Sequence, residues 1–354
     1  MSALPPVRPD LKLGEGYHSP QVEAAVRLNT NESPFPPPRE WTEELLDALG
    51  RVSFNRYPDR PATELREAVA ARHGVTPEEV FCANGSNEVL QCLLLAYGGP
   101  ERRALVFAPT YALHAHISRL TGTEVIEGSR DEAFRIEPVH AAALLSAERP
   151  DVTFLCSPNN PTGLSEPRET VRAVLDAAPG LVIVDEAYGQ FSSWSALELR
   201  GTAHPGLVVT RTFSKTWAMA GARLGYLVGD PEAVRACESV ALPYHLSAQT
   251  QLAGLLALRH TAEMETRVAL ISEERGRVAA ALGDLPVESW PSDANFILFR
   301  PKSKDADEVW RSLLAHSVLI RNCTGWEGLP GCLRVTIGRP DENDRFLTAL
   351  KESL

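Results

Sequence analysis

Four short apolar segments of this chain are each followed at once by polar residues that could do chemistry. In chain order these polar residues include Gly85-Ser86-Asn87, Asn159-Asn160, Asp185 and Lys215. If the apolar segments are parallel strands, their carboxyl ends meet at one edge of a sheet, where open sheets of this kind bind ligands. We therefore expect the four groups to surround a single ligand.

The first group could bind a phosphate. Apolar residues at positions 89, 90, 93 and 94 predict a helix that begins at Gly85, Ser86 and Asn87. Free backbone N–H groups, a serine hydroxyl and the positive end of the helix dipole together suit a phosphate. An ordinary helix cap has the same residues, so both interpretations stay open.

The third group is a carboxylate that should be buried. Asp185 follows four apolar residues, Leu181 to Val184. A buried carboxylate requires a charged or strongly hydrogen-bonding partner. A protonated pyridine nitrogen would be such a partner, and an ion pair with an arginine is the alternative.

Lys215 lies in a segment rich in small residues, Ser214 to Gly225, which would let a ligand approach the backbone closely. The nearby cation Arg223 would favour the neutral amine, the form that nucleophilic imine chemistry needs. A single lysine is more often a surface residue. Here the four strand ends together supply what a phosphorylated pyridine bound as an imine would require.

The segments that must position these groups alternate between short apolar runs and helical patterns. This alternation predicts a mostly parallel sheet covered by helices on both faces. Helices are expected at Glu40–Leu49 and Thr63–His73. The expected strands are Val80–Ala83, Ala104–Phe107, Val152–Cys156, Leu181–Val184, Leu207–Thr210 and Leu224–Gly229.

After Pro243 the pattern changes to that of a smaller α+β domain. Helices are expected at Gln249–His260, Glu263–Leu282 and Asp305–His316, and strands at Val287–Trp290, Asn295–Phe299 and Leu333–Ile337. With a proline-rich start, the chain is predicted to divide into an N-terminal arm (1–38), a large domain (39–245) and a small domain (246–354).

Composition excludes several other classes. The 35 Lys and Arg residues are scattered and outnumbered by 46 Asp and Glu, for a formal net charge of -11, which argues against a nucleic-acid partner. No apolar stretch approaches the ~18 residues that cross a bilayer, and the first ten residues lack the order of a signal peptide. A cytoplasmic location is expected.

A metal site is not expected. The six cysteines lie far apart without a C-x-x-C pair and are expected to be reduced and buried. His114 and His116 stand two residues apart, so on a helix they would point to different faces.

The motifs resemble a known family. Asn159-Asn-Pro-Thr-Gly163, Asp185-Glu-Ala-Tyr188 and Ser214 to Arg223 resemble the core motifs of fold-type I aminotransferases of classes I and II, which use pyridoxal 5′-phosphate (PLP). Within that family the chain is similar to histidinol-phosphate aminotransferases from about Tyr17 onward. The segments that carry this second resemblance are Leu28–Pro34, Arg56–Asp59, Gly85–Glu88 and Leu333–Gly338.

The resemblance implies the fold-type I architecture, a homodimer, PLP as cofactor and transamination of histidinol phosphate with 2-oxoglutarate in histidine biosynthesis. Lys215, Asp185 and Tyr188 would be catalytic. Cofactor binding would fall to Gly85, Ser86, Asn87, Tyr111, Asn160, Asp185, Tyr188, Ser214, Lys215 and Arg223, with Tyr57 reaching in from the second subunit. Substrate binding would fall to Tyr17, Asn31, Asn160, Arg321 and Arg334.

Two departures from the family pattern concern substrate choice. The segment Arg321 to Trp326 and the residue His114 after Tyr111 differ from many relatives, and both could favour aromatic amino acids. The alternatives are therefore a broad or aromatic aminotransferase and a PLP decarboxylase of the threonine-phosphate type. A non-enzymatic PLP-fold regulator is disfavoured by the acidic charge and the lack of a preceding DNA-binding segment.

Overall fold

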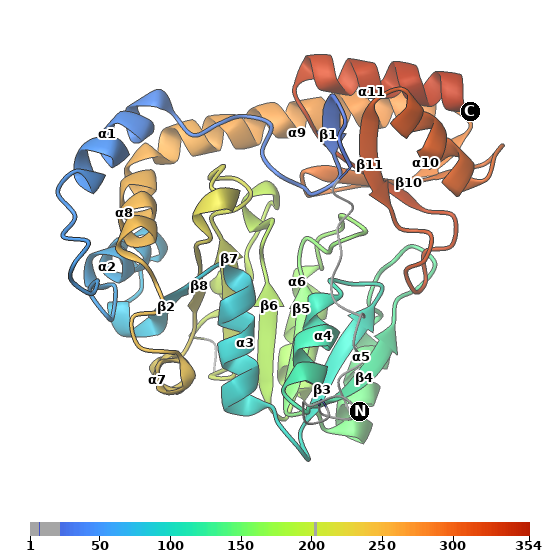
Figure 1. The fold of residues 1–354 in the computed structure, drawn as a ribbon. Coiled ribbons are helices and arrows are strands. Elements are labelled where there is room, and N and C mark those ends of the chain that lie inside the picture. The colour runs from blue at the N-terminus through green and yellow to red at the C-terminus, as the bar shows by residue number, and fades with distance from the viewer. Residues whose placement is uncertain (1–6, 8–21, 202–203) are drawn as a thin grey trace, which may run out of the picture.

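Two β-sheets organise the chain, each with its own helices (Figure 1). The computed structural model describes residue 7 and residues 22–201 and 204–354. The larger sheet has seven strands and the smaller has five. The mostly parallel sheet with helical cover and the smaller α+β part agree with the expected fold class.

The seven-stranded sheet has the order β2-β8-β7-β6-β5-β3-β4. All neighbouring strands pair in parallel except β8, which is antiparallel to β2 and to β7. Its strands are β2 (Val80–Ala83), β3 (Arg103–Ala108), β4 (Glu124–Ser129), β5 (Val152–Cys156), β6 (Leu181–Asp185), β7 (Leu207–Thr212) and β8 (Gly225–Val228).

Alternating side chains of these strands face two different helical layers. Phe154 and Ile183 pack with α3 (Ser86–Tyr97), α4 (Leu113–Leu120) and α7 (Pro231–Val240). Leu155 and Val184 face the other way, against α5 (Pro138–Glu148) and α6 (Arg168–Ala177). Because both faces are buried, these strands read as continuous apolar runs in the sequence.

Further helices cover one end of this sheet. Helices α1 (Arg39–Leu49), α2 (Thr63–His73) and α8 (Ala248–Ala257) pack around β2 and β8. The indole Nε1 of Trp41 in α1 donates to the carbonyl of Ala253 in α8, at 3.0 Å. The 23-residue helix α9 (Thr261–Gly283) then leads to the second sheet.

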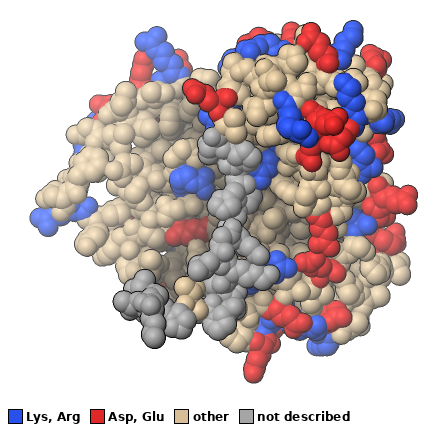
Figure 2. All heavy atoms as spheres, turned by 45° about the vertical axis from the view of Figure 1, so that its right-hand side comes forward, with Lys and Arg blue, Asp and Glu red and all other residues tan. Residues whose placement is uncertain are grey.

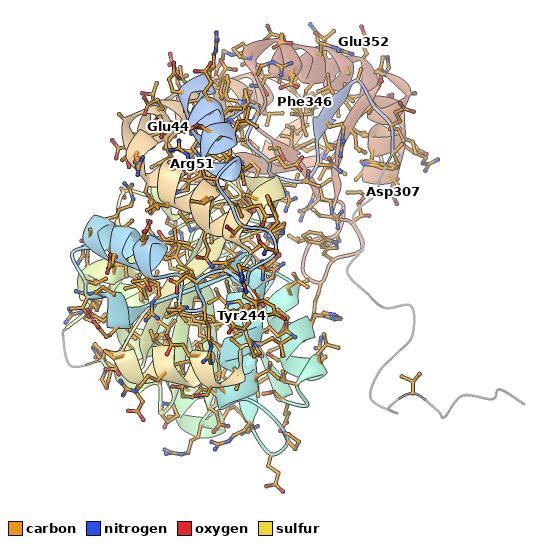
Figure 3. The ribbon with its side chains drawn as sticks, turned by 60° about the vertical axis from the view of Figure 1, so that its left-hand side comes forward. Glu44, Arg51, Tyr244, Asp307, Phe346 and Glu352 are labelled. Atoms are coloured by element: carbon orange, nitrogen blue, oxygen red, sulfur yellow. The ribbon has the colours of Figure 1, made fainter. Side chains whose placement is uncertain are left out.

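The five-stranded sheet has the order β1-β11-β12-β10-β9. Its core includes Phe296, Phe299 and Phe346, the last of which comes from α11 (Pro340–Ser353) and is labelled in Figure 3. Its elements are β1 (Val26–Leu28), β9 (Val287–Ser289), β10 (Phe296–Pro301), α10 (Ala306–Ala315), β11 (Val318–Asn322), β12 (Leu333–Thr336) and α11 (Pro340–Ser353).

β1 lies in the segment that the sequence assigns to the N-terminal arm, and it pairs in parallel with β11. The domain boundaries at residues 38 and 245 stay predictions. Short 3₁₀ turns complete the elements at Pro77–Glu79, Gly189–Phe191, Ala196–Leu199, Ala220–Ala222 and Leu258–His260.

Charged residues of both signs are interspersed on the face shown in Figure 2. Among the helices of the described residues, none is long and apolar enough to cross a membrane.

Candidate active site

A cavity of about 390 Å³ opens where β5, β6 and β7 end, and it lies against the small sheet. Cys156, Asp185 and Thr212, the last residues of those three strands, all line it. The sequence-predicted residues in its wall are Asn31, Ser86, Asn87, Tyr111, Asn160, Asp185, Tyr188, Ser214, Lys215, Arg223 and Arg334. The four polar groups that follow apolar segments thus do meet in one place.

Lys215 lines this cavity and is half-buried. Its Nζ donates to the carbonyl of Thr30 at 3.1 Å and lies 5.6 Å from the centre of the Tyr188 ring. Burial, and then the positive charge of Arg334, lower the pKa of the Lys215 amine from 10.5 to about 8. The neutral amine, the nucleophilic form, is therefore well populated in mildly alkaline solution.

This lowered pKa predicts how PLP binding to the cofactor-free protein depends on pH. The neutral fraction of the amine rises with pH and reaches one half near pH 8. Stopped-flow absorbance should show the rate of covalent PLP binding rising through that pH and levelling above it. A rate that keeps rising toward pH ~10.4, as for an exposed lysine, would contradict this environment for Lys215.

Asp185 is only 1% exposed, and His114 is its partner. His114 Nε2 lies 3.0 Å from Oδ2, while the backbone N–H of Ala187 donates to Oδ1 at 3.1 Å. Within the described residues, no arginine forms an ion pair with Asp185, so the arginine alternative is not what the structure contains. The carboxylate instead faces the cavity.

Aromatic rings hold His114 in place. Its ring stacks on Phe154, with centroids 4.7 Å apart, and meets the edge of Tyr111 at 5.4 Å. Tyr111 in turn donates its hydroxyl to Asn87 Oδ1 at 3.2 Å. His114 was not among the predicted site residues. Its position three residues after Tyr111, at the start of α4, is the only signal that could have placed it here.

Two glycines allow the phosphate-binding candidates to converge. A Cβ on Gly85, whose φ is +80°, would lie 2.6 Å from Nη2 of Arg223. A Cβ on Gly225 would lie 2.2 Å from the backbone N of Ser86. Arg223 also reaches Ser214, with 3.3 Å between Nη1 and Oγ. The start of α3, a hydroxyl and a guanidinium therefore converge in an arrangement that suits a phosphate.

The small sheet closes the opposite side of the cavity. Asn31 donates from Nδ2 to the hydroxyl of Tyr188 at 2.9 Å, and its Oδ1 accepts from Thr336. Arg334 donates to Asn160 Oδ1 and to the Asn29 carbonyl. Burial raises the pKa of Tyr188, which keeps its hydroxyl protonated.

Three of the predicted residues that the structure describes do not line this cavity. Gly85 directly precedes the wall residue Ser86, and Arg321 is buried on β11 directly opposite Arg334. Tyr57 is 79% exposed and stacks on Tyr244, with centroids 4.4 Å apart. Tyr17 lies outside the described residues.

Several wall residues were not predicted from the sequence, and they contribute mainly backbone or small side chains. The acceptor of the Lys215 amine, for example, is a backbone carbonyl, which no residue type signals. These residues are Thr30, Glu32, Cys156, Ala187, Thr212, Ala220 and Gly221.

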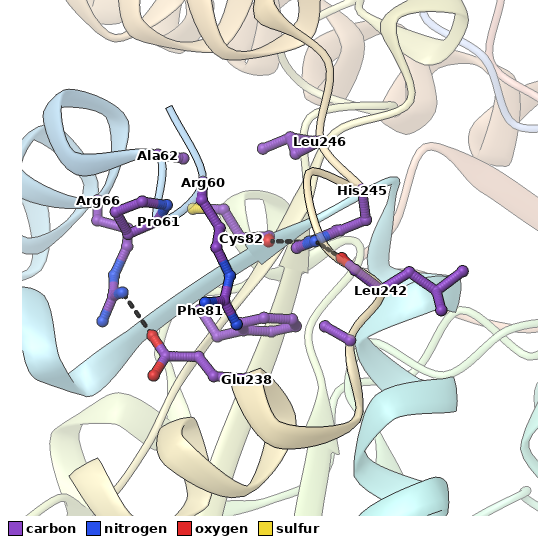
Figure 4. Close-up of a pocket in the computed structure, with 11 residues that line it drawn as sticks. Arg60, Pro61, Ala62, Arg66, Phe81, Cys82, Glu238, Leu242, His245 and Leu246 are labelled. Atoms are coloured by element: carbon purple, nitrogen blue, oxygen red, sulfur yellow. Dashed lines mark hydrogen bonds and ion pairs between the residues drawn. The ribbon is translucent and has the colours of Figure 1, made fainter. Parts of the chain in front are cut away.

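A second cavity, of about 270 Å³, lies at β2 and the segment after α7 (Figure 4). An ion pair between Arg66 and Glu238, at 2.6 Å, lines it, and His245 Nε2 lies 3.1 Å from the carbonyl of Cys82. Of the predicted site residues that lie within the described parts of the chain, none lines this second cavity.

The residues of the main cavity fit PLP. The glycines and Ser86 leave room for a phosphate beside Arg223, and Asp185 offers a buried carboxylate to a pyridinium nitrogen. Lys215, with its lowered pKa, can bind an aldehyde as an imine.

Comparisons with known proteins agree with this chemistry. Residues 23–350 match the family described as "Aminotransferase class I and II". The chain is 46% identical to the histidinol-phosphate aminotransferase of Nocardia farcinica, covering 97% of this chain and 90% of that one. It is also 46% identical to that of Mycobacterium avium, covering 97% and 87%.

A solved structure has the same fold. The histidinol-phosphate aminotransferase of Sinorhizobium meliloti, in complex with pyridoxal-5′-phosphate, superposes with a TM-score of 0.86 at 24% identity. The match covers 93% of this chain and 90% of that chain.

Proposed function

Because this chain belongs to the aminotransferase family of classes I and II, we propose that it transfers the amino group of L-histidinol phosphate to 2-oxoglutarate. The products are imidazole acetol phosphate and L-glutamate, a step of histidine biosynthesis. The observation that carries this choice of substrate is the 46% identity to histidinol-phosphate aminotransferases over 97% of the chain.

The cofactor is PLP, which when bound supplies an electron sink for the reaction at the substrate α-carbon. Lys215 acts first as a general base, which removes a proton from that carbon. It then acts as a general acid, which gives the proton back to complete the amino transfer. The Asp185 carboxylate would stabilise the protonated pyridine nitrogen of PLP. The ring of His114 holds that carboxylate in place, with 3.0 Å between Nε2 and Oδ2.

The remaining wall residues are proposed to bind and orient the cofactor. Arg223, Ser214 and the N-terminus of α3 would hold the phosphate of the cofactor. Asn160 and Tyr188 would bind its ring hydroxyl, and Tyr111 would contact its ring. Residues 30–32 close the cavity and exclude water from the amine of Lys215, whose burial lowers its pKa.

For the substrate we propose Arg334 as the principal anion-binding residue, with Arg321 beside it. Arg334 is 4% exposed and lines the cavity, and its guanidinium already contacts Asn160. A guanidinium binds a phosphate or a carboxylate through two parallel hydrogen bonds, so one site can accept both substrates in turn. Tyr17 and Asn31 are proposed to close over the bound substrate.

This assignment is tested against its alternatives by steady-state kinetics. The value of kcat/KM for histidinol phosphate should exceed that for phenylalanine by at least about tenfold, since specificity is the ratio of these values. Comparable values would support the aromatic aminotransferase. Release of carbon dioxide from threonine phosphate without amino transfer would identify the decarboxylase.

We further propose that the enzyme is a cytoplasmic homodimer in which Tyr57 binds the cofactor phosphate of the second subunit. Tyr57 is exposed and lies outside the cavity of its own chain. Tyr244, which stacks on Tyr57, is also exposed, as are Phe54 and Leu242 close to these two residues in the sequence, which suits a surface that another copy covers. The six buried, free cysteines fit a reducing compartment.

A mixing experiment tests the dimer. If each site takes Lys215 from one subunit and Tyr57 from the other, a dimer of one Lys215→Ala chain and one Tyr57→Ala chain has one site with both residues intact. Its other site lacks both. After subunit exchange, activity should rise to about a quarter of that of the wild type, because half of the dimers are hybrids. No gain over the separate variants would mean that Tyr57 acts within its own subunit or not at all.

A further inference from the structure

The loop between β11 and β12 presents Trp326 in a fixed position. Its backbone N–H donates to Cys323 at 2.9 Å, and its carbonyl accepts from Leu329 at 3.1 Å. The ends of the loop are joined by the N–H of Cys323 and the carbonyl of Cys332, at 3.1 Å. Trp326 thus lies on an ordered loop directly beyond the two strands that carry Arg321 and Arg334.

Arg321 and Arg334 are two side chains of like charge that lie close together. They occupy directly opposed positions of the antiparallel strands β11 and β12, and they are only 6% and 4% exposed. Like charges at such positions repel each other. The hydrogen-bond partners that Arg334 has among the described residues are neutral oxygens of Asn160 and Asn29. Arg334 is therefore a buried cation with neutral hydrogen-bond partners, as suits a group that binds an anion.

Trp326 lies against both guanidinium groups. The Cζ of Arg321 is 5.2 Å from the centre of the indole ring, and the Cζ of Arg334 is 5.9 Å from it. The Arg334 guanidinium also lies 5.1 Å from the ring of Phe296. The negative face of an aromatic ring attracts cations, most strongly when water is excluded. One indole can therefore offset the repulsion between two cations.

We propose that Trp326 is a positioning residue that fixes both arginine side chains for anion binding and so sets the affinity for both substrates. A guanidinium must keep its plane to bind an anion through two hydrogen bonds. Trp326 does not line the cavity around Lys215 and acts through the arginines. The inference rests on the proposed function, since it concerns the phosphate of histidinol phosphate and a carboxylate of 2-oxoglutarate.

The test compares Trp326→Ala and Trp326→Phe with a matched control. The ring of Trp194 contacts Arg168 of α6 at the same distance, 5.2 Å, but neither residue lines the cavity. Trp326→Ala should raise KM for both substrates by roughly tenfold and change kcat by less than about twofold. Trp326→Phe should restore most of the affinity, and Trp194→Ala should leave both KM values unchanged.

A donor without an anionic group separates this role from a merely structural one. L-Histidinol lacks the phosphate, so its kcat/KM should be the same in Trp326→Ala and in the wild type. Unchanged KM values in Trp326→Ala, or an equal loss of activity toward L-histidinol, would overturn the proposal. Failure of the wild type to use histidinol phosphate would refute the proposed function instead, and KM for 2-oxoglutarate with another donor would still test Trp326.

Discussion

Replacing Lys215 by alanine is expected to lower turnover by roughly 10⁴-fold, the upper range for loss of a general acid–base group. The variant also loses the only amine that lines the cavity, among the residues that the structure describes. Steady-state kcat measures the first effect. Borohydride reduction followed by mass spectrometry measures the second, because only an imine is trapped as a covalent adduct.

Lys304 provides the control for this variant. Its amine donates to the carbonyl of Ser353 at 2.8 Å, and it does not line the cavity. Lys304→Ala should keep the turnover of the wild type and the borohydride-trapped adduct. Normal turnover by Lys215→Ala would overturn the assignment of the whole site.

Replacing Asp185 by asparagine is expected to lower kcat/KM by roughly 10³-fold, because removing one partner of a buried charged pair costs about 3–5 kcal/mol. Asparagine keeps the size of the side chain and can still hydrogen-bond His114, so the change is mainly the loss of one negative charge. Stopped-flow measurement of the first half-reaction should place the loss in the proton-transfer step and not in substrate binding.

The neighbouring carboxylate serves as the control. Glu186 is as buried as Asp185, but it points away from the cavity to Arg211, with 2.5 Å between the charged atoms. Glu186→Gln should lower the melting temperature and leave kcat/KM of the folded fraction within about threefold. A loss in Glu186→Gln as large as in Asp185→Asn would mean that burial of charge, and not the position of Asp185, causes the effect.

Ser86, Asp185 and Lys215 could be expected at one cavity because each lies at or shortly after the end of a buried strand. β2 and β5 have the predicted bounds, and β6 extends one residue further to include Asp185. Parallel strands of one sheet bring their carboxyl ends together without any further information. The local pattern therefore sufficed to gather Ser86, Asp185 and Lys215 around one cavity.

Elements that depend on distant partners were not predicted. β4 (Glu124–Ser129) is an edge strand whose side chains are largely exposed, so its sequence lacks the apolar run of the central strands. β1 has three residues and is defined by pairing with β11, which lies about 290 residues later. β11 itself was also missed.

The same reason explains the site residues that were missed. His114 faces Asp185, 71 residues away, and only the packing of α4 on the sheet brings them together. The contact of Trp326 with both arginines depends on the strand register of β11 and β12, which the sequence does not reveal.

The most direct test of the proposed reaction is the absorbance spectrum of the PLP-loaded protein as an amino donor is added without any oxo acid. Histidinol phosphate should convert the visible band of the lysine-bound cofactor to the band of pyridoxamine phosphate, at far lower concentration than phenylalanine does. No conversion by histidinol phosphate, or conversion by phenylalanine at equal or lower concentration, would contradict the proposed function.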